Sequence, residues 1–303
     1  MSTTKSPPKK KAALQKTTAP KTKGKAPAKE KLQVDMELVN KQFASVDIGS
    51  LHENSPEFEA LEKAHELFWA AQPIKSAAAG IRLGHKLLKI SPLHMDAYTT
   101  LGRYSPDKQV ALELFQKALT VGENLWGEEF FEDLMGNFWL FPPTRPYMRA
   151  LHGIMTIYRE MGDTENTIRY CERILELNEN DNMGMRYILL PILIEKGDAK
   201  KAEKLFKFYK GDYSAAWYYG RALLDFRKHG DSKKANKSLN EAFDMNRHVP
   251  RFITKKKKMP AKLPPYYQPG QESEAIAYMS ESMSAWENTP EAVEWIAKQL
   301  ASK

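Results

Sequence analysis

Apolar residues in the middle of the chain recur at intervals of three and four, which is the spacing of one face of an α-helix. Six such stretches lie between residues 147 and 248, and they form three pairs with a Gly-Asp dipeptide inside each pair. Glycine can end a helix in a left-handed conformation and aspartate can cap the next helix, so each pair predicts a helix-turn-helix unit. The dipeptides are Gly162-Asp163, Gly197-Asp198 and Gly230-Asp231, separated by 35 and 33 residues.

The distance between these units is typical of tetratricopeptide repeats, which have a period of about 34 residues. In such repeats a small residue stands five positions after the turn glycine, and a large residue follows four positions later. Further helical stripes at 81–90, 97–102 and 110–120 indicate degenerate repeats upstream. The sequence therefore predicts an all-α fold, a tetratricopeptide-like helix-turn-helix solenoid. The small and large positions hold Thr167, Ala202 and Ala235, and Cys171, Phe206 and Leu239.

Composition divides the chain into six expected segments. The first is rich in lysine, proline and alanine and has too little apolar surface to offset the entropy of ordering it, so we expect it to be disordered. In order, the segments are a disordered tail at 1–35, a helical region with degenerate repeats at 36–125, an aromatic junction at 126–146, three tetratricopeptide-like repeats at 147–248, a basic proline-rich connector at 249–270, and capping helices at 271–303.

Large aromatic side chains are concentrated between the early and the late repeats. Such a density of rings favours a packed junction between two helical arrays. An exposed hydrophobic docking surface is the alternative. The rings belong to Trp126, Phe130, Phe131, Phe138, Trp139, Phe141 and Tyr147.

A family resemblance covers residues 146–300. It is most specific at His248-Val249-Pro250 and at Glu274 to Tyr278, with Trp286 following. These stretches resemble the C-terminal half of the suppressor of tumorigenicity seven family, which implies a helical, tetratricopeptide-like protein without an assigned enzymatic activity. Animal members of that family carry membrane spans. The longest apolar run here, 187–194, is too short to span a bilayer and contains a proline, so we expect no membrane span.

The formal charge of +8 is distributed unevenly along the chain. Residues 1–31 contain ten lysines and one acid, and residues 245–271 contain seven cations and no acid, so the remaining segments sum to −8. The tail resembles those of linker histones in composition. Both basic segments are candidates for binding phosphates through counterion release, and a merely solubilising tail is the alternative. The candidate phosphate-binding residues are Lys9, Lys10, Lys11, Lys255, Lys256, Lys257 and Lys258.

No arrangement of residues in the sequence indicates catalysis. The seven histidines show no metal-ligand spacing, and no glycine-rich phosphate loop occurs. The single cysteine, Cys171, falls on an apolar helical stripe, where a small buried hydrophobe is expected rather than a nucleophile. We therefore expect no enzymatic activity, no cofactor, no metal and no small-molecule substrate. Without a secretory signal or a disulfide framework, the expected location is the cytoplasm, or the nucleus if the source is a eukaryote.

The first helices of stacked helix pairs line a concave groove, and positively charged and aromatic residues occupy the groove positions of this chain. Arginine forks bind carboxylates in a bidentate manner, so the groove favours a protein partner with an acidic peptide or a terminal carboxylate. The alternative is that these cations pair with neighbouring acids and contribute little. The predicted partner-binding residues are Arg145, Arg149, His152, Arg159, Tyr187, Trp217, Arg227 and Lys228.

Two functions follow from these patterns. The first is a non-enzymatic scaffold or adaptor that binds a peptide or protein partner in a basic and aromatic concave groove. The alternative is a nucleic-acid-associated protein that holds phosphates with the lysine-rich tail and the basic connector.

Overall fold

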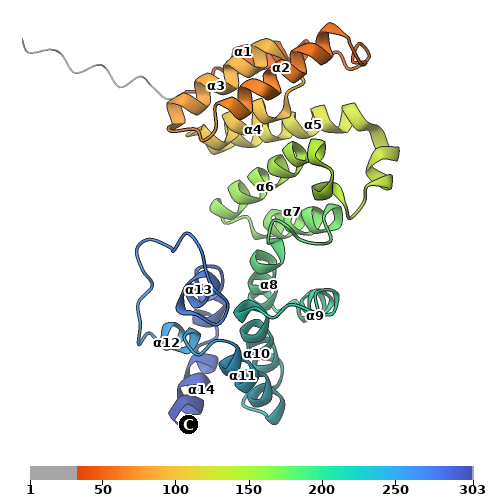
Figure 1. The fold of residues 1–303 in the computed structure, drawn as a ribbon. Coiled ribbons are helices and arrows are strands. Elements are labelled where there is room, and N and C mark those ends of the chain that lie inside the picture. The colour runs from red at the N-terminus through yellow and green to blue at the C-terminus, as the bar shows by residue number, and fades with distance from the viewer. Residues whose placement is uncertain (1–32, 302–303) are drawn as a thin grey trace, which may run out of the picture. The chain divides into compact units, whose positions relative to one another are not determined.

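The computed structural model describes residues 33–301, all of which belong to one compact unit. In this part of the chain every regular element is a helix (Figure 1). The first helices are α1 (Met36–Ala44), α2 (Pro56–Ala70), α3 (Ala77–Ile90), α4 (Met95–Tyr104) and α5 (Lys108–Asp133), followed by the short 3₁₀ turns η1 (Phe138–Leu140) and η2 (Pro142–Thr144). The others are α6 (Arg145–Glu160), α7 (Thr164–Leu177), α8 (Met185–Lys196), α9 (Ala199–Phe208), α10 (Ala215–His229), α11 (Lys233–Met245), α12 (Val249–Ile253), α13 (Glu272–Glu287) and α14 (Pro290–Ala301).

The helices pack as antiparallel neighbours in chain order, so the predicted all-α, tetratricopeptide-like solenoid is confirmed. Close pairs are α4 with α5, α6 with α7, α8 with α9 and α10 with α11, and first helices of successive pairs also touch, α4 against α6 and α8 against α10. The expected disordered tail lies almost wholly outside the described residues. Its last residue, Asp35, caps α1 by accepting a hydrogen bond from the Leu38 amide at 3.0 Å.

The predicted turns are confirmed in two of the three repeats. Gly162 and Gly197 are left-handed, each with φ 75°, and the aspartates after them accept amide hydrogen bonds that cap α7 and α9. The prediction for Asp231 is wrong, because Ser232 caps α11. Gly230 has ψ −156°, and the helix after it begins one residue later than in the other two turns. Asp231 instead accepts hydrogen bonds from Asn236 and Lys298.

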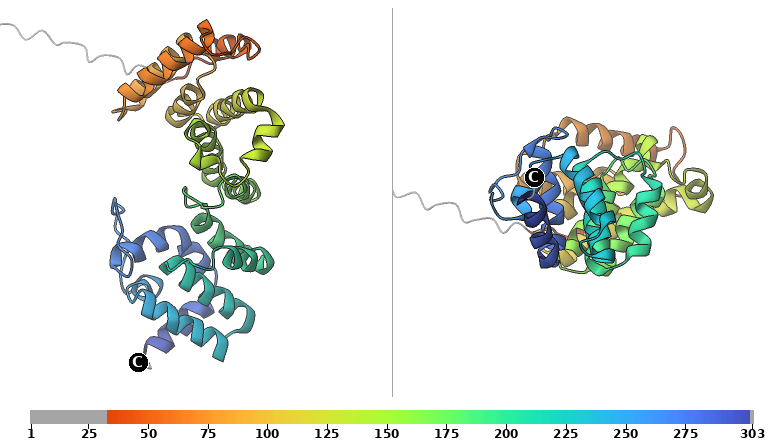
Figure 2. Two further views of the ribbon diagram at one scale, coloured as in Figure 1. Left: turned by 45° about the vertical axis from the view of Figure 1, so that its right-hand side comes forward. Right: turned by 90° about the horizontal axis from the view of Figure 1, so that it is seen from below.

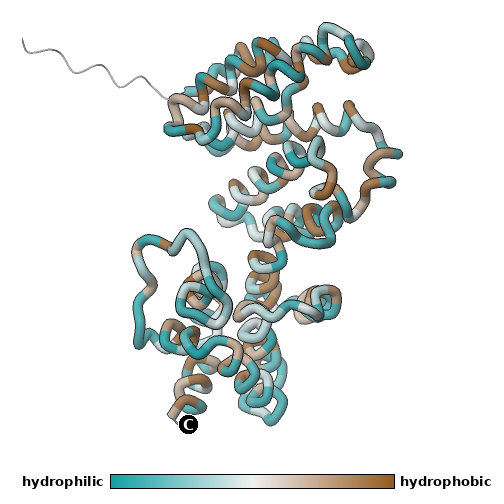
Figure 3. Tube along the Cα trace, in the orientation of Figure 1, coloured by the Kyte–Doolittle hydropathy of each residue, from teal (hydrophilic) through white to brown (hydrophobic). Residues whose placement is uncertain are grey.

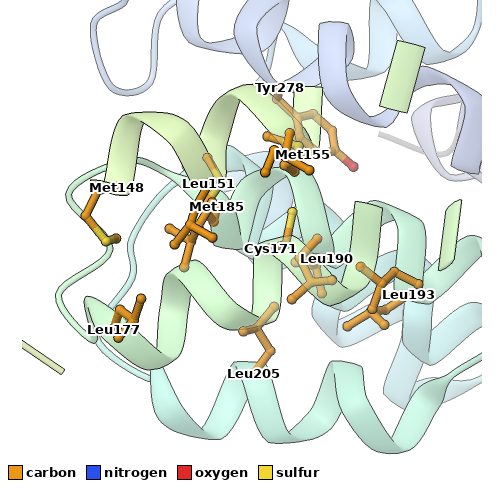
Figure 4. Packing of buried hydrophobic residues seen from close by; sticks show 14 of the residues in the cluster. Met148, Leu151, Met155, Cys171, Leu177, Met185, Leu190, Leu193, Leu205 and Tyr278 are labelled. Atoms are coloured by element: carbon orange, nitrogen blue, oxygen red, sulfur yellow. The ribbon is translucent and has the colours of Figure 1, made fainter. Parts of the chain in front are cut away.

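The repeat positions identified from the sequence all point into the core. At each of the six positions the side chain is buried, which explains the preference for small residues where two helices approach and for larger ones between them. Figure 4 shows part of this cluster, in which Cys171 of α7 lies with residues of α6, α8, α9 and α13.

The aromatic stretch is mostly a packed junction. Helix α5 continues into it and bends at Gly127, whose φ of 69° and ψ of 174° are accessible to glycine and strained for other residues. Phe138 is fully buried, and its ring lies 4.9 Å from that of Phe131. Phe141 is the exception, since 42% of it is exposed.

The C-terminal helices do more than follow the last repeat. Helix α13 packs along α8 and α10, the first helices of the second and third repeats, while α14 contacts α10 and α12 (Figure 2). Residues 254–271, which we call the strap, link α12 to α13 as an open loop without helix or strand. Apolar residues concentrate where the helices meet, and the strap is largely polar (Figure 3).

Candidate functional site

Helix α13 is held on the first helices of the repeats by polar contacts along its length. Glu281 of α13 forms an ion pair with Arg159 of α6, with 2.6 Å between the charged atoms. One turn later and at the end of the helix, Ser284 and Asn288 donate hydrogen bonds to Glu195 of α8, each at 2.5 Å. The inner face of the second and third repeats is therefore covered by the chain's own helix, where a bound peptide was expected.

The beginning of α13 is fixed by one buried carboxylate. Glu274 is 4% exposed and accepts hydrogen bonds from the Ala215 amide at 2.9 Å, the Asn246 side chain at 2.9 Å and the Gly270 amide at 2.7 Å. These donors come from α10, from the end of α11 and from the strap. A single residue thus aligns three segments, and its negative charge is compensated by three donors.

A pocket of about 280 Å³ remains between α8, α10, α13 and the strap. Its walls combine aromatic rings, aliphatic groups and hydroxyls, and the two carboxylates in the lining, Glu274 and Glu281, are already engaged. The residues that shape it most are Tyr187, Ile188, Ala216, Tyr267, Ala277 and Tyr278.

The position of Tyr187 in the pocket wall is fixed by polar contacts. Its hydroxyl donates to Asp212 at 2.8 Å, and the Arg186 guanidinium, bound to Asp212 at 2.7 Å and to Asp181 at 2.9 Å, lies 4.3 Å from the Tyr187 ring centroid. Burial raises the pKa of Tyr187 to about 12, so the hydroxyl stays a donor at neutral pH. The ring therefore presents an ordered wall to the pocket.

Two of the arginines predicted in the groove, Arg145 and Arg149, bind groups within the chain. Arg149 forms a bidentate pair with Asp96 of α4, at 2.9 Å and 2.6 Å, and the Asp96 side chain is only 1% exposed. Arg145 donates to the Trp139 carbonyl at 3.0 Å. His152 is half-buried, and burial lowers its pKa, with the charge of Arg103 acting in the same direction. The two arginines thus hold α6 to α4 and to η1.

The remaining predicted groove residues are also engaged. Arg227 donates to the Thr289 hydroxyl at 3.0 Å, and Lys228 pairs at 2.7 Å with Glu203 of α9. Trp217 is 6% exposed and packs on Phe206 with 5.0 Å between ring centroids. Of the eight predicted residues, Tyr187 lines the pocket, and Arg159 contacts it only indirectly, by pairing with the lining residue Glu281.

The predicted phosphate-binding lysines divide into three groups. Lys9, Lys10 and Lys11 lie outside the described residues. Lys255 pairs with Glu287 at 3.1 Å and Lys257 with Glu272 at 2.5 Å. Lys256 and Lys258 are exposed and form no ion pair with any residue that the structure describes.

Sequence reasoning missed the pocket residues that come from α13 and the strap, Tyr267, Tyr278 and Glu281. The missed signal lies in the apolar pattern of α13, whose buried residues spread over more than one face. A helix that only caps an array keeps a polar outer face, so a broad apolar surface indicates a helix covered on two sides.

Two further properties concern residues 33–301 alone. They contain no group of three or more histidine, cysteine, aspartate or glutamate side chains that could hold a metal ion. None of their helices is long and apolar enough to cross a membrane.

Cys171 is buried, and burial raises its pKa to about 12, so the thiol stays protonated at neutral pH.

Comparisons with known proteins found a similar solved structure and a matching family model. The chain is similar to the crystal structure of YrrB, described as a TPR protein with an unusual peptide-binding site, at 20% identity and a TM-score of 0.42, over 62% of this chain and 85% of that one. No curated protein matches. A family model does match, over residues 85–303, and it is not that of the suppressor of tumorigenicity seven family, so that resemblance is not confirmed. The match spans more than half of the sequence, and the chain belongs to the family described as Transcriptional repressor TCF25.

Proposed function

We propose that this protein is a non-enzymatic scaffold, and that a protein partner anchors one apolar or aromatic side chain in the pocket beside α13. The observation that supports this most is the pocket itself, where Tyr187, Tyr267 and Tyr278 surround about 280 Å³. Aromatic walls with a few hydroxyls suit an anchor side chain, because buried anchors supply most of the binding energy of protein interfaces.

The chemistry of the pocket revises the partner expected from the sequence. The arginines that favoured an acidic peptide are paired internally, Arg149 with Asp96 and Arg159 with Glu281. A carboxylate arriving in the pocket would face Glu274 and Glu281. An uncharged anchor avoids that repulsion. The pocket volume of about 280 Å³ also lies just below the range of about 300 to 1,000 Å³ for small-molecule sites, which favours a side chain over a whole ligand.

Filling the pocket tests this function. Selection of a displayed random peptide library on the full chain should enrich peptides that share an apolar or aromatic anchor. Ala277→Trp places a large ring in the pocket and should abolish the enrichment, whereas Ala297→Trp, on the exposed face of α14, should preserve it. If the Ala277→Trp variant enriched the same peptides as the native chain, or if the native chain enriched none, the pocket would not be the binding site.

The family description adds a cellular setting. A transcriptional repressor acts in the nucleus, so membership of this family favours a nuclear location over the cytoplasmic one expected from the sequence. Imaging of the fluorescently tagged full chain in a eukaryotic cell tests this, and complete exclusion from the nucleus would argue against it.

A nucleic-acid-associated function is the second candidate, and exposed lysines favour it. Lys256, Lys258 and Lys262 of the strap form no ion pair with a described residue, so their charges are available to phosphates. Retention on a heparin column should fall steeply with salt if phosphates are held. Comparing the full chain, a chain without residues 1–31, and a triple Lys→Gln variant of the strap shows which segment is responsible. Salt-independent retention of all three would reject this function.

A further inference from the structure

The backbone of the strap is held by hydrogen bonds near its two ends, and between them the strap makes only side-chain packing contacts, such as those of Met259 with the core and Tyr267 with the pocket. At one end the Lys257 amide donates to the Arg251 carbonyl at 2.8 Å, and at the other the Gln268 amide donates to the Ser273 hydroxyl at 3.0 Å. Residues 258–267 form no hydrogen bond or ion pair with any described residue. Figure 1 shows them as an open loop between α12 and α13. The backbone of this segment is therefore available to another molecule.

This segment contains a concentration of exposed apolar side chains. Within residues 33–301, ten large hydrophobic residues are exposed, and three of them lie in the five-residue sequence Leu263-Pro264-Pro265-Tyr266-Tyr267. Leu263 is 50% exposed, Tyr266 86% and Tyr267 53%. Exposed apolar residues that gather in one place mark interaction sites more often than single ones do.

The two prolines restrict the backbone of this segment to the extended conformation that proline-recognition domains bind. Each proline ring fixes φ near −65°, and a residue that precedes proline is restricted to extended or polyproline II backbone, which applies to Leu263 and Pro264. A polyproline II helix has three residues per turn, so extending it through the segment places Pro264 and Tyr267 on the same face. Tyr266 then points to a different face.

We propose that Pro264-Pro265-Tyr266-Tyr267 is a docking segment for a partner domain of the WW type, which binds proline-rich peptides of the Pro-Pro-x-Tyr pattern in an aromatic-lined groove. A segment that is already restricted loses little conformational entropy on binding. Lys256, Lys258 and Lys262 lie on the same strap without ion pairs, so the favoured partner has acidic residues around its groove.

Direct titration with a defined domain tests the proposal. A purified, fluorescently labelled WW domain of the class that binds Pro-Pro-x-Tyr peptides is titrated with the full chain, and anisotropy reports binding. We expect Pro264→Ala and Tyr267→Ala each to weaken binding by at least about tenfold, because these two residues share a face of the extended segment. Tyr266→Ala is the matched control, because it removes the more exposed ring from the other face, and it should change affinity by less than about twofold.

Three results would overturn the proposal. The native chain failing to bind the WW domain is the first, and an equal loss for the Tyr266 and Tyr267 variants is the second, since it indicates non-specific contact with exposed rings. The third is binding of a single-stranded oligonucleotide instead, weakened by either tyrosine variant, which indicates base stacking. Circular dichroism confirms that each variant keeps its helices.

The proposal is separable from the function proposed for the pocket. Tyr267 contributes to both, but Ala277→Trp fills the pocket without changing the docking segment. That variant should bind the WW domain as the native chain does, so failure of one proposal leaves the other intact.

Discussion

Single charged residues in this molecule hold helices together where a ligand was expected to be bound. The Asp96 side chain is almost completely buried on α4, and the Arg149 guanidinium from α6 supplies its compensating charge. Arg159 makes a comparable contact with Glu281, but both side chains are substantially exposed. The two ion pairs therefore differ in the stability that is lost when one partner is removed. Burial of Asp96 excludes the water that would otherwise hydrate an unpaired charge.

Removing the Arg149 side chain should show this difference. Arg149→Ala leaves Asp96 buried without its partner, and we expect the free energy of unfolding to fall by about 3 kcal/mol. Arg159→Ala should cost about 0 to 1 kcal/mol, since its pair is exposed. Urea denaturation followed by circular dichroism measures both, and equal effects of the two variants would show that Asp96 finds another donor.

A buried histidine gives the fold a pH dependence. Burial lowers the pKa of His94 to about 4, against the opposing charge of Asp96 and with His65 and Arg149 adding to the decrease. The unfolded chain takes up this proton near pH 6.5, well before the folded chain does. Stability due to neutral His94 is therefore complete above pH 6.5 and is lost as the pH falls towards 4, by up to about 3 kcal/mol.

Replacing His94 with phenylalanine should flatten that dependence. The side chain lies beside the Phe68 ring, at 5.7 Å between centroids, so an aromatic substitute keeps most of the packing. Unfolding free energies measured from pH 7 to pH 4 should decline less for His94→Phe than for the native chain. Parallel curves would mean that other groups cause the acid destabilisation, among them His85 and His152, whose pKa values are also lowered by burial.

At the scale of elements, glycines set how closely neighbouring helices approach. A methyl group added at Gly84 of α3 would lie 2.5 Å from the Leu101 side chain of α4 and 3.1 Å from the Ala97 carbonyl oxygen. A backbone atom cannot move aside as a flexible side chain does. The close contact between α3 and α4 therefore depends on the absence of a side chain at this position.

We expect Gly84→Ala to lower the unfolding free energy by about 1 to 2 kcal/mol, even though alanine favours the helix by up to about 1 kcal/mol. Gly211→Ala is the matched control, because nothing lies within 4 Å of the added methyl group, and its effect should stay within about 0.5 kcal/mol. Thermal or urea unfolding compares the two. A neutral Gly84 variant would show that α3 and α4 can move apart at little cost.

The sequence predicted those elements whose signals are local. Glycine turns, caps and the apolar stripe of each helix depend on neighbours within a few residues, so the three repeats were predictable. The position of α13 was not, because it depends on contacts between distant residues such as Glu195 and Asn288. Tyr187 could be named as a candidate because it lies at a groove position of a local repeat. Tyr267 and Tyr278 were missed because they reach the pocket only through the packing of α13 and the strap on distant helices.

Considered as a whole, the second half of the molecule departs from an ideal repeat array. In such an array each unit contacts only its neighbours, and the stabilities of the units combine nearly independently. Here α13 touches both α8 and α10, and Glu274 joins α10, the end of α11 and the strap. These contacts couple two repeats to one terminal helix.

Hydrogen exchange should reveal this coupling. In low concentrations of denaturant, the slowest amides of α8, α10 and α13 should exchange with the same opening free energy, because opening one exposes the others. Mass spectrometry of the exchanged, proteolysed chain measures it for each helix. A distinctly lower value for α13 would show that this helix detaches alone and that the repeats beneath it are stable without it.

The packing of α13 on α8 also affects how the chain folds during its synthesis. Glu195 bonds to Ser284 and Asn288, which are added to the growing chain 89 and 93 residues later. At a synthesis rate of about 5 to 20 residues per second, several seconds therefore pass between the synthesis of α8 and that of the helix that covers it. Its apolar inner face is open to chaperones and to other nascent chains over that interval, so synthesis of α13 is the step that ends this exposure.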